Sequence, residues 1–142
     1  MNMKPARSFP GLDPTSEPCP CGRGPVEAQC CGRYRSGGPL EGKAPDAESL
    51  MRSRYTAYVR GDAAYLLASW HPRTRPEAIE PDPPGLVWLG LEVKQHRPID
   101  ADHAEVRFVA RSKRAGRAHR LQETSRFVRE DGRWFYVDGR DP

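Results

Sequence analysis

The four cysteines of this 142-residue chain lie close together in the sequence, as the pair Cys19 and Cys21 and the pair Cys30 and Cys31. A Zn²⁺ ion takes four soft ligands at the corners of a tetrahedron. Two short-range pairs joined by one loop supply these ligands at little cost in backbone entropy. We therefore predict that all four cysteines bind one metal ion.

Other uses of the four thiols are less compatible with their spacing. A disulfide between the adjacent residues Cys30 and Cys31 would close a strained ring, and a reducing compartment opposes disulfides in general. A redox dithiol stays open as an alternative, although C-x-C differs from the usual C-x-x-C spacing, and so do free structural cysteines. Four thiolates would leave no open coordination position, so we expect a structural metal and assign no catalytic residue.

The composition points to a cytoplasmic protein. The chain has a net charge of +4, with 37% hydrophobic and 30% charged residues, and it has neither a signal-peptide pattern nor an apolar run that could cross a membrane. This net positive charge is compatible with contact to an acidic partner surface, but it does not by itself indicate nucleic-acid binding.

Changes in composition divide the chain into four segments. Residues 1–16 are polar and rich in proline, which predicts a disordered tail. The cysteine module spans residues 17–38, and the glycine- and proline-rich residues 39–45 predict a linker. Residues 46–142 hold the periodic segments and are expected to form the larger domain.

Helices come first in this larger domain and strands follow. Asp46 is placed to cap a helix that closes with Arg60 and Gly61. Asp62 can cap a second helix over 63–71, which Pro72 helps to stop. Four strand-like segments follow, separated by turn sequences at 100–102, 113–118 and 130–133. The predicted fold class is α+β with an antiparallel meander.

One arginine falls on the apolar side of the first predicted helix. On a helical wheel Arg54 lies within the arc that holds Tyr55 and Tyr58, and a buried arginine needs a partner. Glu123 shares strand parity with Leu121 and Phe127, so we expect an inward ion pair between Arg54 and Glu123. Such a pair would be either a structural brace or part of a ligand pocket, unless Arg54 extends outward to solvent.

Two further residues complete the candidate pocket. His71 ends the second predicted helix and could reach the pocket mouth, although no acid is placed near it by local spacing and histidine is common at helix ends. Trp88 is either a pocket wall or a core aromatic residue. The candidate pocket residues are Arg54, Tyr55, Tyr58, His71, Trp88 and Glu123.

Three segments resemble known families. The segment "PCPCGRGPVEAQCCG" resembles the SEC-C motif, a small metal-binding module, although the family's usual residues are replaced at Arg23, Pro25 and Val26. The segments "LMRSRYTAYVRGDAAYLLASWHP" and "ETSRFVREDGRWFYVDG" resemble the YchJ family, in which this motif precedes a nuclear transport factor 2-like domain. That resemblance implies a cystatin-like fold with helices packed on a curved antiparallel sheet. It further implies bound zinc, or iron at the same thiolates, and no established enzymatic activity.

Three functions remain open at this point. A non-catalytic, metal-stapled interaction module for protein or ribosomal partners is favoured, because the only sharp chemical signal is a closed site. A small-molecule or enzymatic pocket in the larger domain is the alternative. RNA binding is the second alternative, through a basic hairpin with arginines or lysines at 107, 111, 113, 114, 117 and 120.

Overall fold

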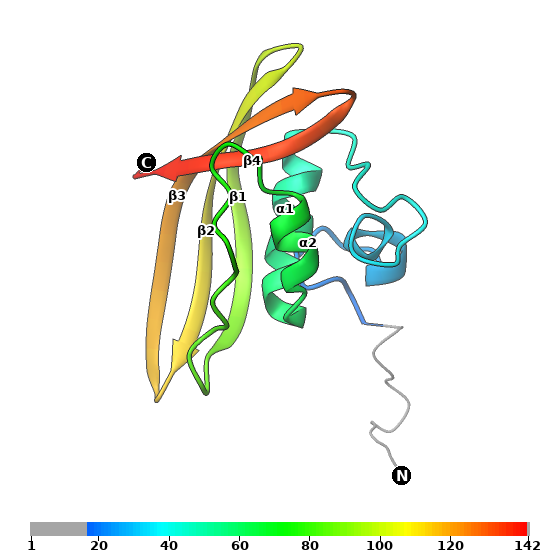
Figure 1. The fold of residues 1–142 in the computed structure, drawn as a ribbon. Coiled ribbons are helices and arrows are strands. Elements are labelled where there is room, and N and C mark those ends of the chain that lie inside the picture. The colour runs from blue at the N-terminus through cyan, green and yellow to red at the C-terminus, as the bar shows by residue number, and fades with distance from the viewer. Residues whose placement is uncertain (1–16, 142) are drawn as a thin grey trace.

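The computed structural model describes residues 17–141, so the predicted disordered tail 1–16 lies outside the described residues. A short cysteine-containing module is followed by two helices and a four-stranded sheet (Figure 1). The elements in chain order are η2 (Glu27–Gln29), η3 (Cys31–Arg33), α1 (Ala47–Arg60), α2 (Ala63–Ala68), β1 (Val87–Asp100), β2 (His103–Arg114), β3 (Arg117–Glu130) and β4 (Arg133–Arg140). The predicted α+β class, with helices before a meander, is confirmed.

Helix α1 begins and ends where its capping residues predict. The Asp46 carboxylate accepts a hydrogen bond from the Ser49 amide at 2.7 Å. Gly61 takes the left-handed conformation, with φ 72°, that terminates many helices. Both ends of this 14-residue helix are therefore satisfied by local contacts.

Helix α2 is shorter than predicted, although its Asp62 cap is confirmed. It ends at Ala68 because the next residues pair with β4: the Tyr136 amide donates to Ser69 O at 2.9 Å, and the His71 amide donates to Tyr136 O at 2.8 Å. Trp70 thus forms a parallel bridge with Tyr136 rather than a last helical turn. A pairing partner 66 residues away in sequence overrides the local helical pattern.

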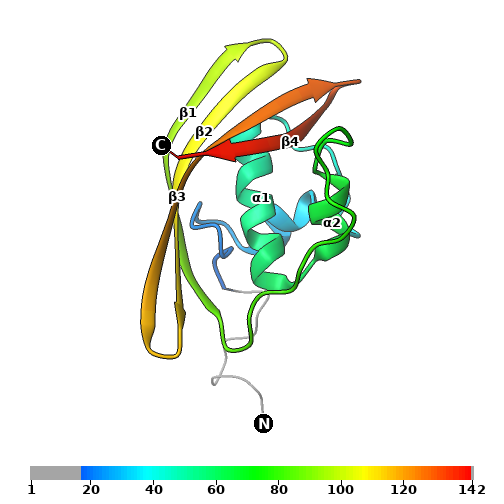
Figure 2. The same cartoon turned by 60° about the vertical axis from the view of Figure 1, so that its left-hand side comes forward.

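The sheet has the simple antiparallel order β1-β2-β3-β4. Turns with positive φ close two of its hairpins, at Ala115-Gly116 and at Asp131-Gly132. Strand β1 carries three register shifts against β2, which bend the sheet. Figure 2 shows this curvature, with α1 lying along the concave side.

The core lies between α1 and the sheet. Its buried members include Leu50, Tyr55, Leu66, Val106 and Phe127. No helix within residues 17–141 is long and apolar enough to cross a membrane.

Candidate metal centre and cavity

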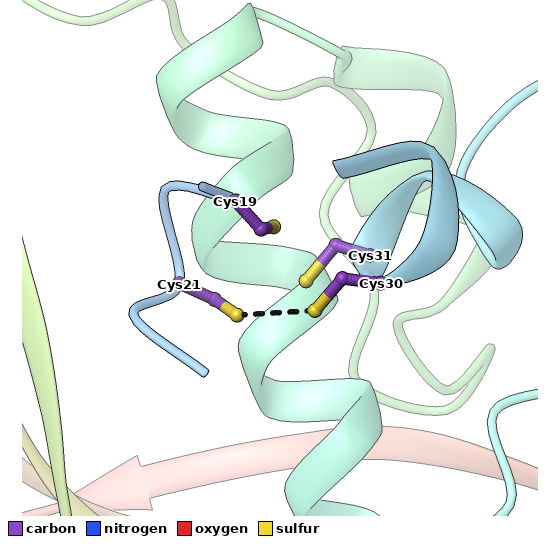
Figure 3. Close-up of side chains that lie close together, drawn as sticks. All are labelled: Cys19, Cys21, Cys30 and Cys31. Atoms are coloured by element: carbon purple, nitrogen blue, oxygen red, sulfur yellow. Dashed lines mark hydrogen bonds between the residues drawn. The ribbon is translucent and has the colours of Figure 1, made fainter. Parts of the chain in front are cut away.

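The four cysteines converge on one point beside α1 (Figure 3). Their sulfur atoms all lie within 4.8 Å of one another, and all four residues are buried. Metal–sulfur bonds of ~2.3 Å in a tetrahedron place the sulfurs ~3.8 Å apart, so this donor set fits one zinc-sized ion. Cys30 and Cys31 lie at the junction of η2 and η3, whereas Cys19 and Cys21 lie in the preceding turn.

The crowded thiols shift one another's pKa values in opposite directions: hydrogen bonds with Cys21 and Cys31 lower the pKa of the Cys19 thiol below its usual range. Burial, together with the neighbouring sulfurs, raises the pKa of Cys30 to about 12. Hydrogen bonds with Cys19 and Cys21, together with burial, raise the pKa of the Cys31 thiol above its usual range. Without a cation the four sulfurs cannot all ionise, and a metal ion at their centre would supply the missing positive charge.

The cluster is closed by the larger domain. The Thr56 hydroxyl of α1 lies 3.6 Å from the Cys19 sulfur. Arg52, one helical turn earlier, donates to Cys21 O at 2.9 Å. Leu91 of β1 packs against the sulfurs. The cysteine module is therefore seated on α1 and β1, and its metal-binding face points inward.

Charged residues seal the edges of this contact. Arg23, which departs from the usual SEC-C pattern, donates to the Ser49 hydroxyl at 3.0 Å and lies 3.3 Å from the Glu48 carboxylate. At the other end, Arg35 pairs with Glu27 and, at 2.9 Å, with Asp62. In this chain the Arg23 side chain thus contacts the protein's own helix.

A cavity of about 270 Å³ lies on the opposite side of α1, against the sheet. Five of the six predicted pocket residues line it: Arg54, Tyr55, Tyr58, Trp88 and Glu123. Further walls come from residues that the sequence does not identify as pocket residues: Met51, Trp70, Phe108, Phe127 and Tyr136.

Arg54 and Glu123 share this cavity, but the expected direct ion pair between them is absent from the described residues. Arg54 donates to Leu66 O at 2.8 Å and to the Ser69 hydroxyl at 2.7 Å. Tyr136 lies between the two charges: its ring is 4.5 Å from the guanidinium carbon, and its hydroxyl donates to Glu123 at 3.4 Å. Strand parity predicted the inward direction of Glu123 but could not predict the spacing across the cavity.

His71 lies outside the cavity. Its ring is buried against Phe135, and its Nε2 is 3.0 Å from the Glu130 carboxylate. Its Nδ1 accepts a hydrogen bond from the Arg73 amide. Because α2 ends early and His71 pairs with Tyr136 of β4, the His71 ring contacts the half-exposed Glu130 carboxylate.

The basic hairpin is formed by the ends of β2 and β3. Arg111 lies 3.5 Å from the Glu92 carboxylate, and Arg114 donates to Pro84 O at 3.0 Å. The basic residues at its tip are exposed. Exposed charged side chains at the tip of a hairpin are ordinarily solvated, which explains these charges without a ligand.

Comparison with known proteins agrees with the fold and the module. The family model described as "YchJ, middle NTF2-like domain" matches residues 46–139. A UPF0225 protein of Methylibium petroleiphilum is 66% identical over 122 residues, which cover 86% of this chain and 87% of that protein. A UPF0225 protein of Bordetella parapertussis is 54% identical over 128 residues, covering 89% and 96%.

Solved structures show the same arrangement. The solution structure of a SEC-C motif containing protein from Rhodopseudomonas palustris has a TM-score of 0.77 and 29% identity, covering 89% of this chain and 99% of its own. The crystal structure of another such protein, from Psychrobacter arcticus, has a TM-score of 0.70 and 25% identity, covering 87% and 82%. The chain therefore belongs to the YchJ family of UPF0225 proteins, and it combines an N-terminal cysteine cluster that fits a SEC-C module with an NTF2-like domain.

Proposed function

We propose that the four thiolates hold a structural zinc ion and that the protein is a non-catalytic binding protein. The observation that carries this proposal is the convergence of four buried sulfurs within 4.8 Å of one another. Four thiolates saturate a tetrahedral ion, which leaves no position for a substrate or a reactive water molecule. Iron is the alternative metal for the same four thiolates.

The proposed role of the metal is to fix the module against the larger domain. The contacts of Thr56 with Cys19 and of Arg52 with Cys21 O support this role, because they join the ligand loop directly to α1. Metal-binding energy would then appear as folding energy of the module.

Metal analysis combined with native mass spectrometry tests the proposal. We expect one zinc per wild-type chain and loss of the metal from a double variant with Cys30→Ser and Cys31→Ser. The exposed neighbour Gln29, whose side chain makes no hydrogen bond within residues 17–141, offers the matched control Gln29→Ser. Full zinc content in the double variant would contradict the proposal. Iron in the purified wild type would identify iron, rather than zinc, as the structural metal.

We further propose that the protein works in the cytoplasm, where thiols stay reduced and free to bind metal, and that it docks a protein or ribosomal partner. A pull-down at moderate salt should recover a partner with the wild type and Gln29→Ser but not with the double cysteine variant. RNA as the partner would show itself by steep loss of binding as salt is raised. Recovery of the same partner by all three proteins would show that docking does not depend on the cysteine module.

A further inference from the structure

Arg54 carries a buried charge that forms no ion pair with an acidic group within residues 17–141. Arg54 is only 6% exposed, and burial lowers the pKa of its guanidinium from the usual value. Its two hydrogen-bond partners, Leu66 O and the Ser69 hydroxyl, are neutral, and both bonds come from Nη1. Within residues 17–141, Nε and Nη2 make no hydrogen bond. A buried guanidinium with unused donors is costly unless an anion or acceptor reaches it.

This unused side of Arg54 belongs to the cavity. The residue lines the cavity, and its guanidinium carbon lies 4.5 Å from the ring centre of Tyr136 and 5.1 Å from that of Trp70. Both rings are also cavity walls. The two rings and the Nη1 hydrogen bonds therefore fix the guanidinium, and Nε and Nη2 face the cavity. This is the arrangement of a preformed anion-binding site.

Glu123 is arranged differently across the same cavity. Its Oε2 accepts hydrogen bonds from the Ser125 hydroxyl at 2.6 Å and from the Tyr136 hydroxyl at 3.4 Å, whereas its Oε1 accepts none within residues 17–141. Gly139 on β4 makes room for this carboxylate, because a Cβ there would collide with it. Glu123 is thus held in place with one oxygen left to accept a donor.

Asp82, whose carboxylate accepts a hydrogen bond from the Trp88 indole at 2.9 Å, and Ser125 also line the cavity, and its remaining walls are apolar and rich in rings. Besides the two rings over Arg54, its walls include Tyr55, Trp88 and Phe108. At about 270 Å³ it has the volume of roughly nine water molecules at ~30 Å³ each, which suits a single-ring compound better than a large cofactor. Flat walls of this kind favour an aromatic body through offset or edge-to-face contacts.

We propose that this cavity binds a small aromatic carboxylic acid that also carries a hydroxyl or amino group. The carboxylate pairs with Nε and Nη2 of Arg54, the ring lies among the aromatic walls, and the donor group reaches Oε1 of Glu123. The acid is favoured over a neutral ligand because Arg54 has only neutral partners, whereas Glu123 already accepts two hydrogen bonds. This inference goes beyond the proposed structural zinc site and does not depend on it.

Nuclear magnetic resonance titration of the zinc-loaded protein tests it, with 4-hydroxybenzoate, benzoate and phenol as probes. Trp70 and Trp88 line the cavity and Trp134 does not, so saturable binding should shift the indole N–H signals of the first two and leave the third unmoved. We expect 4-hydroxybenzoate to bind most tightly and phenol at least about tenfold more weakly, as for loss of a charge-assisted hydrogen bond. Equal binding of phenol, or no saturable shift at Trp70 and Trp88, would overturn the proposal.

Variants separate recognition from fold stability. Arg54→Gln should abolish the preference for acids over phenol, whereas Arg107→Gln, which removes the same charge from an exposed position without an ion pair in residues 17–141, should keep it. Glu123→Gln should tighten benzoate and shrink the advantage of 4-hydroxybenzoate over it, which a purely structural role for Glu123 would not produce. Retained acid preference in Arg54→Gln, or unchanged ratios in Glu123→Gln, would count against the proposal. Zinc content measured on the same samples tests the proposed structural zinc site independently of ligand binding.

Discussion

Asp62 joins the cysteine module to the helices, and its replacement should loosen that junction. Its carboxylate caps α2 by accepting from the Tyr65 amide at 3.1 Å. It also accepts from Arg35 at 2.9 Å and from the Ser36 hydroxyl at 2.8 Å. Only 11% of the Asp62 side chain is exposed. We expect Asp62→Ala to lower the free energy of unfolding by about 3 kcal/mol, as the sum of a lost cap and lost charge-assisted bonds.

The two contributions can be measured separately. Loss of the helix cap should cost about 1 kcal/mol, and loss of the charged contact with Arg35 about 2 kcal/mol, because Arg35 already holds a buried Nε without a partner in residues 17–141. Asp62→Asn keeps a good capping residue and removes the charge, so it should cost about 2 kcal/mol. The matched control is Asp102→Asn, whose exposed ion pair with Arg129 should contribute less than about 1 kcal/mol.

The same carboxylate predicts a dependence on pH. Burial acts to raise the pKa of Asp62, but hydrogen bonds from Ser36, Tyr65 and Arg35 outweigh it and lower this pKa below its usual value. A group whose pKa is lowered on folding stabilises the folded state above its unfolded pKa and loses that effect as pH falls through its folded pKa. The difference between wild type and Asp62→Asn should therefore be full at pH 7 and shrink below about pH 4.

Urea unfolding of zinc-loaded protein, followed by circular dichroism, measures these differences. The expected order of midpoints is wild type and Asp102→Asn together, then Asp62→Asn, then Asp62→Ala. Coincident midpoints for all four proteins would refute the claim that Asp62 joins the module to the helices. A loss in Asp62→Ala no larger than that of Asp62→Asn would refute the separate contribution of the cap.

Three further outcomes follow from single contacts. Gly139→Ala should displace the Glu123 carboxylate, because a Cβ would collide with it, and resonance shifts confined to the cavity check this. Burial raises the pKa of Tyr65 to about 12, so its stabilising effect is full below its ordinary pKa of about 10 and declines as pH rises toward 12. Burial also raises the pKa of Tyr136, so ultraviolet titration should find these two phenols resisting ionisation until the fold opens. Thr56→Val should weaken zinc binding by about tenfold, read by competition with a chelating dye, because it removes the hydroxyl beside Cys19. An unchanged zinc affinity would show that this hydroxyl does not support the site.

Local signals predicted the parts of the fold that depend on near neighbours. Helix α1 has its expected bounds because Asp46 and Gly61 satisfy its ends within a few residues. The hairpins turn at the expected sequences because Asp131-Gly132 accepts positive φ. The convergence of the cysteines was also predictable, since the ligand pairs are close in sequence and one loop brings them together.

Contacts between distant segments could not be predicted in this way. His71 meets Glu130 across 59 residues, and Arg52 meets Cys21 O across 31. No spacing rule links such pairs, because their approach depends on how the sheet curves and where α2 ends. The same holds for the Arg54 and Glu123 charges. The helical wheel placed Arg54 inward and strand parity placed Glu123 inward, but only the assembled cavity sets the distance that keeps them apart.

Helix α1 connects the cysteine cluster and the cavity. Arg52 and Thr56, one turn apart, face the cysteines, whereas Arg54, Tyr55 and Tyr58 face the cavity. Because one 14-residue helix carries both faces, a shift of α1 on losing the metal would also move the arginine and the rings of the cavity wall. The double variant with Cys30→Ser and Cys31→Ser should then bind 4-hydroxybenzoate more weakly than Gln29→Ser does, even though no cysteine lines the cavity. Equal affinities in a folded, metal-free variant would show that α1 keeps its place on the sheet without the metal, and that the two sites act independently.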